Sequence, residues 1–525
     1  MKLLVSTLAL MGMHVLFAQN SDWYNKDLGD SGIVGISVDK AFNAVGGATG
    51  QEVIVAIIDS GVDVNHEDLK DNIWINEGEI PGNGIDDDEN GYIDDINGWN
   101  FLGGADGQSV VYETYGVVRH YRSLKKHFEE RDTTTLIGDE LVKYQKLKEI
   151  GRSIESNVKS SEKELISIGQ FDETLGQVKF LLKPFIEDEE VTEELVRSIN
   201  PTDDGIKAAK EIMLQLLASG FDEDEFNQYK EYHRIRKDFH YNIDFDPRGL
   251  IGDNPDDPYE RYYGNSDVFG THADHGTHVA GIIGAVRSNG IGVDGVAENV
   301  KLMILRAVPD GDERDKDIAN AILYAVENGA KVINMSFGKG HSPHKSAVDA
   351  AVRKAEDANV LIVHAAGNAA VDIDEATHFP IETFESGYVP GNWIEVGASD
   401  KKPNDLLVAD FSNYGRAEVD VFAPGVDLYS TLPGNEYGEN SGTSMAAPVV
   451  AGLAAVIWSY NPSISANRVK QLILEGSVSF KNLKVYYPNT TGKREKRTKF
   501  KKLSVTGGIV NLYGSLSEAG NLVNP

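Results

Sequence analysis

Runs of β-branched residues that alternate with helical stretches constrain this chain more than any other feature. Residues 53–58 read Val-Ile-Val-Ala-Ile-Ile, and similar runs recur at 301–307, 331–335, 360–365 and 393–397. Continuous apolar runs of this kind are typical of strands buried on both faces of a parallel sheet. Helical patterns lie between them, at 317–328 and 346–357. The sequence therefore predicts an α/β fold with a doubly wound, mostly parallel central sheet.

One long block interrupts this pattern. From residue 104 to residue 253 β-branched runs are few, and helical spacing appears at 136–150, 161–168 and 206–217, with acidic stretches between the segments. The charges alternate in sign, as they do on a solvated helix face. We therefore expect an α-helical insertion that divides the sheet domain into residues 19–103 and 254–525. A surface insertion is the simplest interpretation, and a partner-binding or self-regulating role stays open.

The composition excludes several classes of protein. The chain has 50 Lys and Arg against 82 Asp and Glu, a formal net charge of −32. Nucleic-acid binders neutralise phosphates with clustered Lys and Arg, so no nucleic-acid partner is expected. The 41% of hydrophobic residues exceeds what a disordered acidic chain contains. Because there is no cysteine, disulfides, thiolate metal sites and a cysteine nucleophile are excluded.

The first eighteen residues predict export. Lys2 is followed by an apolar stretch that ends at Ala18, just before a polar segment. This is the pattern of a secretory signal peptide at residues 1–18. A membrane anchor is the alternative, but about 16 apolar positions are fewer than the roughly 20 that a membrane span needs. We therefore expect a periplasmic or extracellular protein with no membrane span in the mature chain.

An acidic loop predicts a calcium site. Between residues 86 and 95 oxygen-bearing side chains stand at alternate positions, with a glycine at the sixth. Counted from the first aspartate, the ligands would be Asp86, Asp88, Asn90, the Tyr92 carbonyl and Asp94. This spacing begins an EF-hand loop, but the twelfth position lacks the bidentate glutamate and no flanking helix pair is evident. The sequence thus predicts a calcium loop outside a true EF-hand, with a solvated acidic turn as the alternative.

Three short segments carry residues suited to nucleophilic catalysis. Asp59 directly follows the first strand run, His275 opens a helix rich in small residues, and Ser444 follows Gly-Thr at the start of an apolar helix. A nucleophilic serine needs a histidine base and an acid that orients the histidine. A serine at a helix N-terminus is also close to backbone N–H groups that stabilise developing negative charge. An Ala-Ala-Gly-Asn segment that ends at Asn368 lies between the histidine and the serine.

With these four motifs in this order, the chain resembles the subtilisin-like serine proteases, the subtilases, over roughly residues 22–103 and 259–521. The resemblance implies that Asp59 orients the base, that His275 is the general acid and base, and that Ser444 is the nucleophile. It also implies that the side-chain amide of Asn368 joins the oxyanion hole.

The same resemblance implies a substrate site and a second ion site. Ser336 and Gly338 lie in the segment Asn-Met-Ser-Phe-Gly, which matches the strand that pairs with an extended peptide in this family. Lys339 stands where the compact enzymes have a second glycine, so the primary specificity is not predicted. Asp68 and Asn289 match a calcium site of the family.

Together these features predict an exported, calcium-supported serine endopeptidase that cleaves polypeptide substrates through an acyl-enzyme. Two alternatives stay open: a dedicated processing protease for one partner, and a catalytically silent peptide-binding protein with a protease fold. Residues 19–51 are too few for the folding-assisting propeptide common in this family. Either the protein folds without such a propeptide, or the helical block does related work.

Overall fold

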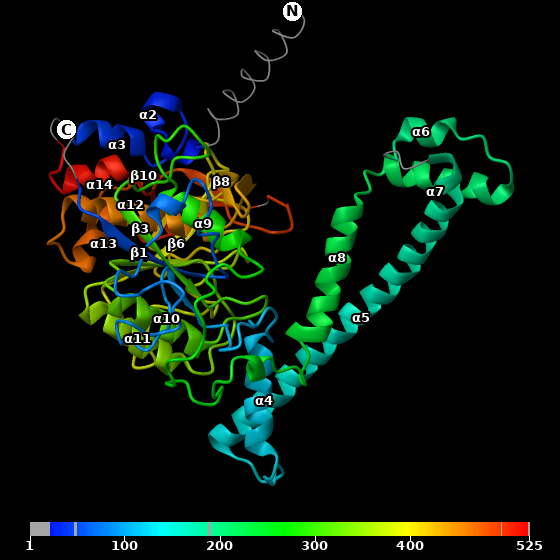
Figure 1. Ribbon diagram of the computed structural model, residues 1–525, viewed down its shortest axis with the longest axis horizontal. Helices are drawn as coiled ribbons and strands as arrows, with labels where there is room; N and C mark the ends of the chain where they lie inside the picture. Colours follow the sequence, from blue (N-terminus) through cyan, green and yellow to red (C-terminus); the bar gives the residue numbers. More distant parts are fainter. Residues whose placement is uncertain (1–21, 47–49, 187–190, 495, 523–525) are drawn as a thin grey trace, which may run out of the picture. The chain divides into compact units, whose positions relative to one another are not determined.

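The chain forms two compact units. The computed structural model describes residues 22–46, 50–186, 191–494 and 496–522 (Figure 1), so the signal peptide predicted at 1–18 lies outside the described residues. One unit, here called the sheet unit, runs up to Val111 and resumes at Pro247. The other, the helical unit, is Tyr112–Asp246 and falls within the block expected at 104–253.

A nine-stranded sheet forms the centre of the sheet unit, in the order β10-β13-β7-β6-β5-β4-β1-β3-β2 (Figure 1). Neighbouring strands are parallel except β10, which runs antiparallel to β13. The strands are β1 (Val53–Asp59), β2 (Gly98–Asn100), β3 (Val300–Arg306), β4 (Val332–Met335), β5 (Leu361–Ala365), β6 (Trp393–Ser399), β7 (Val421–Pro424), β10 (Val478–Ser479) and β13 (Gly508–Ile509). Two hairpins pair β8 (Leu428–Leu432) with β9 (Glu436–Asn440), and β11 (Lys484–Tyr486) with β12 (Arg497–Lys499). The predicted mostly parallel α/β sheet is therefore confirmed.

Helices cover both faces of this sheet (Figure 1). The helices of this unit are α2 (Leu28–Ser31), α3 (Val38–Ala44), α9 (Asp274–Gly284), α10 (Asp315–Glu327), α11 (Lys345–Asp357), α12 (Thr443–Tyr460), α13 (Ala466–Glu475) and α14 (Leu512–Glu518), with short turns η1 (Trp23–Asn25), η2 (Lys70–Asn72), η4 (Arg248–Leu250) and η5 (Phe500–Lys502). The alternation along β1 explains the two layers. Val55 and Ile57 belong to the core that contains α9 and α12, whereas Ala56 and Ile58 belong to the core that contains α10 and α11.

The central helix α12 is nearly all apolar because it is a core helix. Among the described residues it is the single helix whose length and composition would suit a membrane, and most of it is buried inside the sheet unit. It packs against β1, β4, β5, β6 and β7. Its apolar character is therefore explained by this position in the core.

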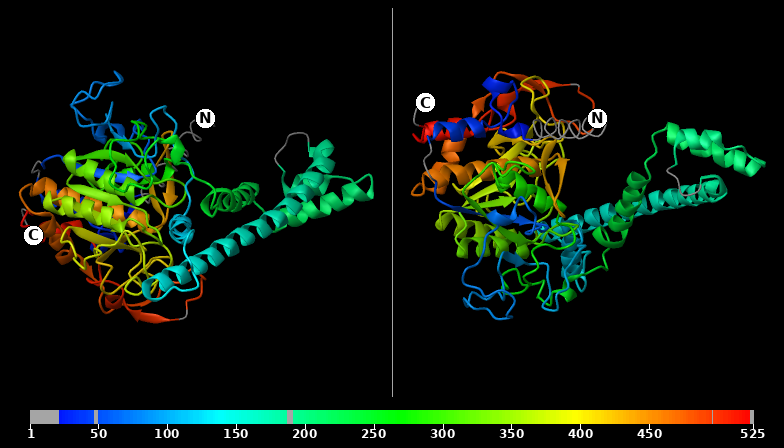
Figure 2. Two further views of the ribbon diagram at one scale, coloured as in Figure 1. Left: turned by 90° about the horizontal axis from the view of Figure 1, so that it is seen from below. Right: turned by 45° about the horizontal axis from the view of Figure 1, so that its top comes forward.

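The helical unit is built around one long helix. Its elements are α4 (Gly116–Phe128), α5 (Gly138–Ile186), α6 (Glu193–Ser198), α7 (Asp204–Ala218), α8 (Glu223–Ile235) and η3 (Arg236–His240). The segments with helical spacing at 136–150 and 161–168 belong to one continuous α5, because Ile150, Ile154 and Val158 continue the apolar face between them and pack in one core. Figure 2 shows α4 beside one end of α5 and α6 and α7 beside the other, and a small apolar core lies at each end.

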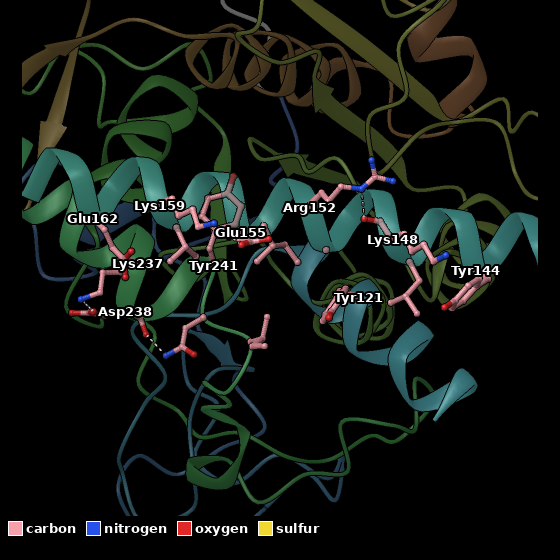
Figure 3. Close-up of a pocket in the computed structure, with 16 residues that line it drawn as sticks. Tyr121, Tyr144, Lys148, Arg152, Glu155, Lys159, Glu162, Lys237, Asp238 and Tyr241 are labelled. Atoms are coloured by element: carbon pink, nitrogen blue, oxygen red, sulfur yellow. Dashed lines mark hydrogen bonds and ion pairs between the residues drawn. The ribbon is translucent and has the colours of Figure 1, made fainter. Parts of the chain in front are cut away.

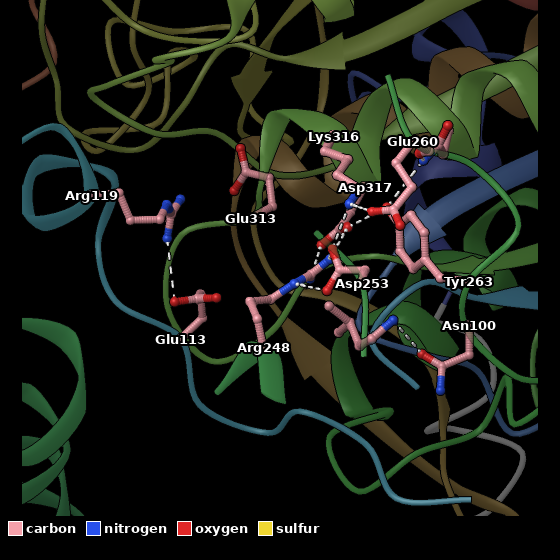
Figure 4. A network of polar contacts seen from close by, with 12 residues as sticks. Asn100, Glu113, Arg119, Arg248, Asp253, Glu260, Tyr263, Glu313, Lys316 and Asp317 are labelled. Atoms are coloured by element: carbon pink, nitrogen blue, oxygen red, sulfur yellow. Dashed lines mark hydrogen bonds and ion pairs between the residues drawn. The ribbon is translucent and has the colours of Figure 1, made fainter. Parts of the chain in front are cut away.

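A buried ion network holds the chain where it re-enters the sheet unit after the helical unit (Figure 4). The Arg248 guanidinium lies 2.9 Å from Asp253 Oδ1 and 2.9 Å from Asp317 Oδ2. The Lys316 ammonium contacts Asp253 Oδ2 at 2.6 Å, and the Tyr263 hydroxyl donates to Asp317 Oδ1 at 2.6 Å. Since Lys316 and Asp317 belong to α10, the returning segment is fixed to the start of that helix.

Candidate active site

Asp59 and His275 are in direct contact at the carboxyl end of β1. Asp59 is the last residue of β1, and His275 is the second residue of α9. Asp59 Oδ1 lies 2.8 Å from His275 Nδ1 and also accepts the Ser60 N–H at 2.8 Å. The Asp59 side chain is 3% exposed, whereas that of His275 is 41% exposed. A buried carboxylate therefore holds one nitrogen of an accessible imidazole.

The environment favours the protonated form of His275. Loss of water around the ring lowers the pKa of His275, but the charge and the hydrogen bond of Asp59 outweigh this effect and raise the pKa above its ordinary value of 6.5. The carboxylate thus stabilises the imidazolium that forms when a histidine base takes up a proton. His278, one turn later, is fully buried against the carbonyls of Leu428 and Gly438 and has no such role.

Ser444 lies at the N-terminus of α12, where backbone N–H groups have no partner within the helix. Its hydroxyl donates to the Ser336 carbonyl at 3.1 Å, and the Ser336 hydroxyl donates to the Ser444 carbonyl at 2.9 Å. Among the hydrogen bonds of the described residues, none joins Ser444 to His275. Hydrogen bonds between a nucleophile and its base are often long without substrate and tighten in the complex. The structure therefore brings Ser444 to the segment predicted to bind substrate.

Thr443 fixes the orientation of the Asn368 amide. Asn368 Oδ1 accepts the Thr443 N–H at 2.9 Å and the Thr443 hydroxyl at 3.0 Å. Because Oδ1 is occupied, Nδ2 is the donor that remains, and a Cβ atom on Gly442 would lie 3.5 Å from it. Asn368 was predicted from its motif, whereas the contact of Thr443 with it was not, although Thr443 directly precedes Ser444.

The substrate segment predicted at Ser336 and Gly338 continues directly from β4. At its end, Lys339 pairs through its backbone with Phe379, with hydrogen bonds of 2.8 Å in both directions. The Lys339 ammonium is buried and lies 2.7 Å from Asp315 Oδ1. Lys339, which stands where the compact enzymes have a second glycine, thus forms a buried ion pair.

The acidic loop gathers Asp86 and Asp88 together with Glu79, a residue that the sequence analysis did not name. One carboxylate oxygen from each lies within 4.8 Å of the others. Glu79 is buried and also accepts the backbone N–H groups of Asp87 and Asp94, at 2.8 and 3.0 Å. Because Glu79 precedes the alternating residues and belongs to another turn, their spacing gave no signal for it.

Asn90 and Asp94 serve the loop in another way. Asn90 Nδ2 donates to Asp88 Oδ2 at 3.1 Å, and Asn90 Oδ1 accepts the Tyr92 N–H at 2.8 Å. The Asp94 carboxylate accepts the N–H groups of Gly82 and Gly84 at 2.7 and 2.9 Å, since that turn presents amides that need an acceptor. The EF-hand count places Asp94 among the ligands; its carboxylate also caps a neighbouring turn, and its role as a calcium ligand stays a prediction.

Asp68 and Asn289 are in contact, but their side-chain oxygens accept N–H groups. Asp68 is buried, and its Oδ1 accepts from Asn289 Nδ2 at 2.6 Å. Its Oδ2 accepts the Val293 N–H at 3.0 Å, while Asn289 Oδ1 accepts the Ile291 N–H at 3.0 Å. A cation between the two side chains would require the Asn289 amide to turn, so the calcium site at this pair stays a prediction.

A separate cavity of about 900 Å³ lies in the helical unit, between α4, α5 and the segment after α8 (Figure 3). Tyr121, Tyr144 and Tyr241 line it, together with charged residues such as Arg152 and Glu155. None of its sixteen lining residues is a serine or a histidine. This cavity therefore does not supply the nucleophile and base described above.

Comparison with known proteins identifies the family of the chain. Residues 50–507 match the model of the subtilase family. A thermophilic serine proteinase from Bacillus sp. (strain AK1) is 44% identical over 184 residues, which are 35% of this chain and 42% of that protein. Subtilisin DY from Bacillus licheniformis is 42% identical over 199 residues, 37% of this chain and 67% of that protein. A solved protease from Pseudoalteromonas arctica PAMC 21717 aligns with 29% identity and a TM-score of 0.37, over 47% of this chain and 70% of that one.

Proposed function

Because the chain belongs to the subtilase family of serine proteases, we propose that it is an exported serine endopeptidase with Asp59, His275 and Ser444 as its catalytic triad. The observation that carries this proposal is the 2.8 Å contact between Asp59 and His275. The position of Ser444 at a helix N-terminus, in contact with Ser336, supports it.

The proposed reaction follows from these contacts. The Ser444 hydroxyl leaves the Ser336 carbonyl and attacks the peptide carbonyl carbon, while His275 takes up the proton that the hydroxyl loses. The imidazolium is stabilised by Asp59 and gives its proton to the leaving amine, which produces the acyl-enzyme. A water molecule then hydrolyses the ester, with His275 again as the base.

Two donors stabilise the oxyanion in this scheme. The Ser444 N–H lies at the start of α12, and the Asn368 amide presents Nδ2 because Thr443 occupies its oxygen. Donors that are already oriented pay no reorganisation cost when negative charge develops on the carbonyl oxygen.

Polypeptides are the proposed substrates. An extended peptide would add as a strand along the backbone of residues 336–338, between the nucleophile at one end and the Lys339–Phe379 bridge at the other. The composition of residues 1–18 supports export.

Calcium is the proposed structural cofactor, at the acidic loop. Glu79, Asp86 and Asp88 offer only carboxylate oxygens, the ligands that calcium prefers, and they lie within reach of one ion. A bound dication would offset repulsion between these carboxylates and hold the loop together.

Mass spectrometry of a digested protein substrate tests the proposed function. The purified chain and its Ser444→Ala variant are incubated with an unfolded protein, and the new peptide ends are mapped. We expect internal cleavages that the variant does not make. Removal of residues only from the ends of the substrate, or equal cleavage by the variant, would contradict the proposal.

A further inference from the structure

A buried group of two histidines and a glutamate lies directly behind the substrate segment. His364 is on β5 and Glu395 is its register partner on β6, while His378 comes from the loop before Phe379. His364 and Glu395 are almost fully buried, and the side chain of His378 is 17% exposed. One ligand atom of each lies within 4.8 Å of the others. The reaction proposed above uses none of the three.

The hydrogen bonds around this group leave one nitrogen of His364 directed at Glu395. His364 Nε2 lies 2.8 Å from the Phe337 carbonyl, which can only accept, so Nε2 carries a hydrogen. His364 Nδ1 lies 2.9 and 3.0 Å from the two carboxylate oxygens of Glu395 and donates to them in the metal-free protein, so a metal ion at Nδ1 would displace this proton. A histidine that donates one N–H to a backbone carbonyl and offers the other nitrogen is the usual arrangement at a metal centre.

Glu395 and His378 also have atoms directed toward this group. The Trp393 indole donates to Glu395 Oε2 at 2.9 Å and so orients the carboxylate. Neither ring nitrogen of His378 has a hydrogen-bond partner among the described residues, although Nε2 lies 3.5 Å from Glu395 Oε1. An oriented carboxylate and an imidazole that lacks a hydrogen bond are both available to an ion.

The spacing suits a small first-row dication. Two ligand atoms about 2.1 Å from a tetrahedral zinc ion are roughly 3.4 Å apart. The distances of 2.9 and 3.0 Å from His364 to Glu395 and of 3.5 Å from His378 to Glu395 lie on either side of this value. The nitrogens of His364 and His378 lie within 4.8 Å of each other, so a shift of the side chains toward a common centre would bring all three onto one ion. Two imidazoles and one carboxylate favour zinc over calcium, which takes oxygen ligands.

We infer that His364, His378 and Glu395 form a zinc site that joins β5, β6 and the loop before Phe379 behind the substrate segment. Through His364 the ion is linked to the Phe337 carbonyl, between Ser336 and Gly338. Bound zinc would therefore stabilise the fold at this place. The site is independent of the calcium loop and of the triad.

Zinc binding to the full chain tests this inference. Calorimetric titration and metal analysis after dialysis are made in excess calcium, so that the oxygen-only sites are filled. We expect about one zinc per chain and a rise in melting temperature on zinc addition. His378→Gln and Glu395→Gln should each lower the affinity at least about tenfold, since each removes a ligand.

Two matched variants control for the other histidines. His275→Gln removes the imidazole of the other histidine–carboxylate pair, and His344→Gln removes one at the start of α11. Both should bind zinc as the unchanged chain does. His378→Gln leaves the His364–Glu395 pair intact, so it decides the question even if Glu395→Gln does not fold. No zinc binding by the unchanged chain, or unchanged binding by folded His378→Gln, would overturn the inference and leave an ion pair without a metal.

Discussion

At the scale of single residues, the carboxylate of Asp59 raises the pKa of His275 and so sets the pH range in which this residue would work as the proposed base. A histidine base must be neutral to take up a proton, and Asp59 raises its pKa above 6.5 against the effect of burial. The acidic limb of the kcat/KM profile should therefore lie above pH 6.5.

Substitution of Asp59 tests this dependence. Asp59→Asn removes the charge that raises the pKa of His275, while the burial that lowers it remains. We expect the acidic limb of the kcat/KM profile to move to lower pH, and kcat to fall by about 10⁴. Steady-state hydrolysis of a fluorogenic peptide from pH 5 to pH 9 measures both. A limb that stays in place would show that another group controls it.

Asn368 is expected to act on the transition state. Asn368→Ala removes one oxyanion donor and should lower kcat by about 10²–10³ with little change in KM, a magnitude measured in subtilisin itself. Thr443→Val keeps the backbone N–H that donates to Asn368 Oδ1 but removes the hydroxyl that also donates to it. Its kcat should therefore fall less than that of Asn368→Ala. Steady-state kinetics of the two variants distinguish these effects. An unchanged kcat in Asn368→Ala would exclude this residue from the oxyanion hole.

Sequence alone located the residues that end a strand or begin a helix. Asp59 closes a β-branched run and Ser444 opens an apolar helix, so each had a local signal. Glu79 and the pair His364–Glu395 had none, because their partners come from other turns or strands. Their roles depend on packing between segments, which residue spacing does not report.

At the scale of elements, long apolar runs predicted five central strands and missed β7 and the strands beyond it and at the other edge. β7 has four residues, and β2, β10 and β13 have only two or three, too few for a recognisable run. In the helical unit, α5 continues between 150 and 161 because Ile154 and Val158 extend its apolar face there.

The acidic loop is the element on which calcium removal should act. Chelation should lower the melting temperature, and added calcium should restore it. A ligand present at a hundred times its dissociation constant stabilises a fold by about 2.7 kcal/mol. Thermal unfolding with and without chelator measures this response.

A double variant assigns the response to the loop. Asp86→Asn with Asp88→Asn should remove most of the difference between chelated and calcium-loaded protein. Glu77→Gln changes the charge at an exposed residue near the same loop and should keep the difference. An equal response in the double variant would place the calcium elsewhere.

At the scale of the whole molecule, the helical unit is an excursion that leaves and returns at one region of the sheet unit. The Val111 carbonyl accepts the Asp310 N–H at 2.9 Å where the chain leaves, and Arg248 pairs with Asp317 where it returns. Val110 and Ile251 also belong to the same apolar core. Long insertions of this kind cost little loop-closure entropy.

Deletion of Tyr112–Asp246 tests whether this unit assists folding. With a short Gly-Ser linker in its place, we expect the sheet unit to refold in calcium with unchanged yield, because each unit has its own apolar cores. Refolding yield and hydrolysis of a short peptide are the measurements. A collapse in yield that the separate helical unit restores would instead assign it a folding role.

We propose above that Ser444 is a nucleophile activated by His275 and Asp59. Labelling of the folded chain with a fluorophosphonate probe, with the adduct mapped by mass spectrometry, is the decisive test. We expect a single adduct on Ser444, absent from Ser444→Ala and strongly reduced in His275→Ala. A folded chain that takes no label, or label that persists in Ser444→Ala, would contradict it.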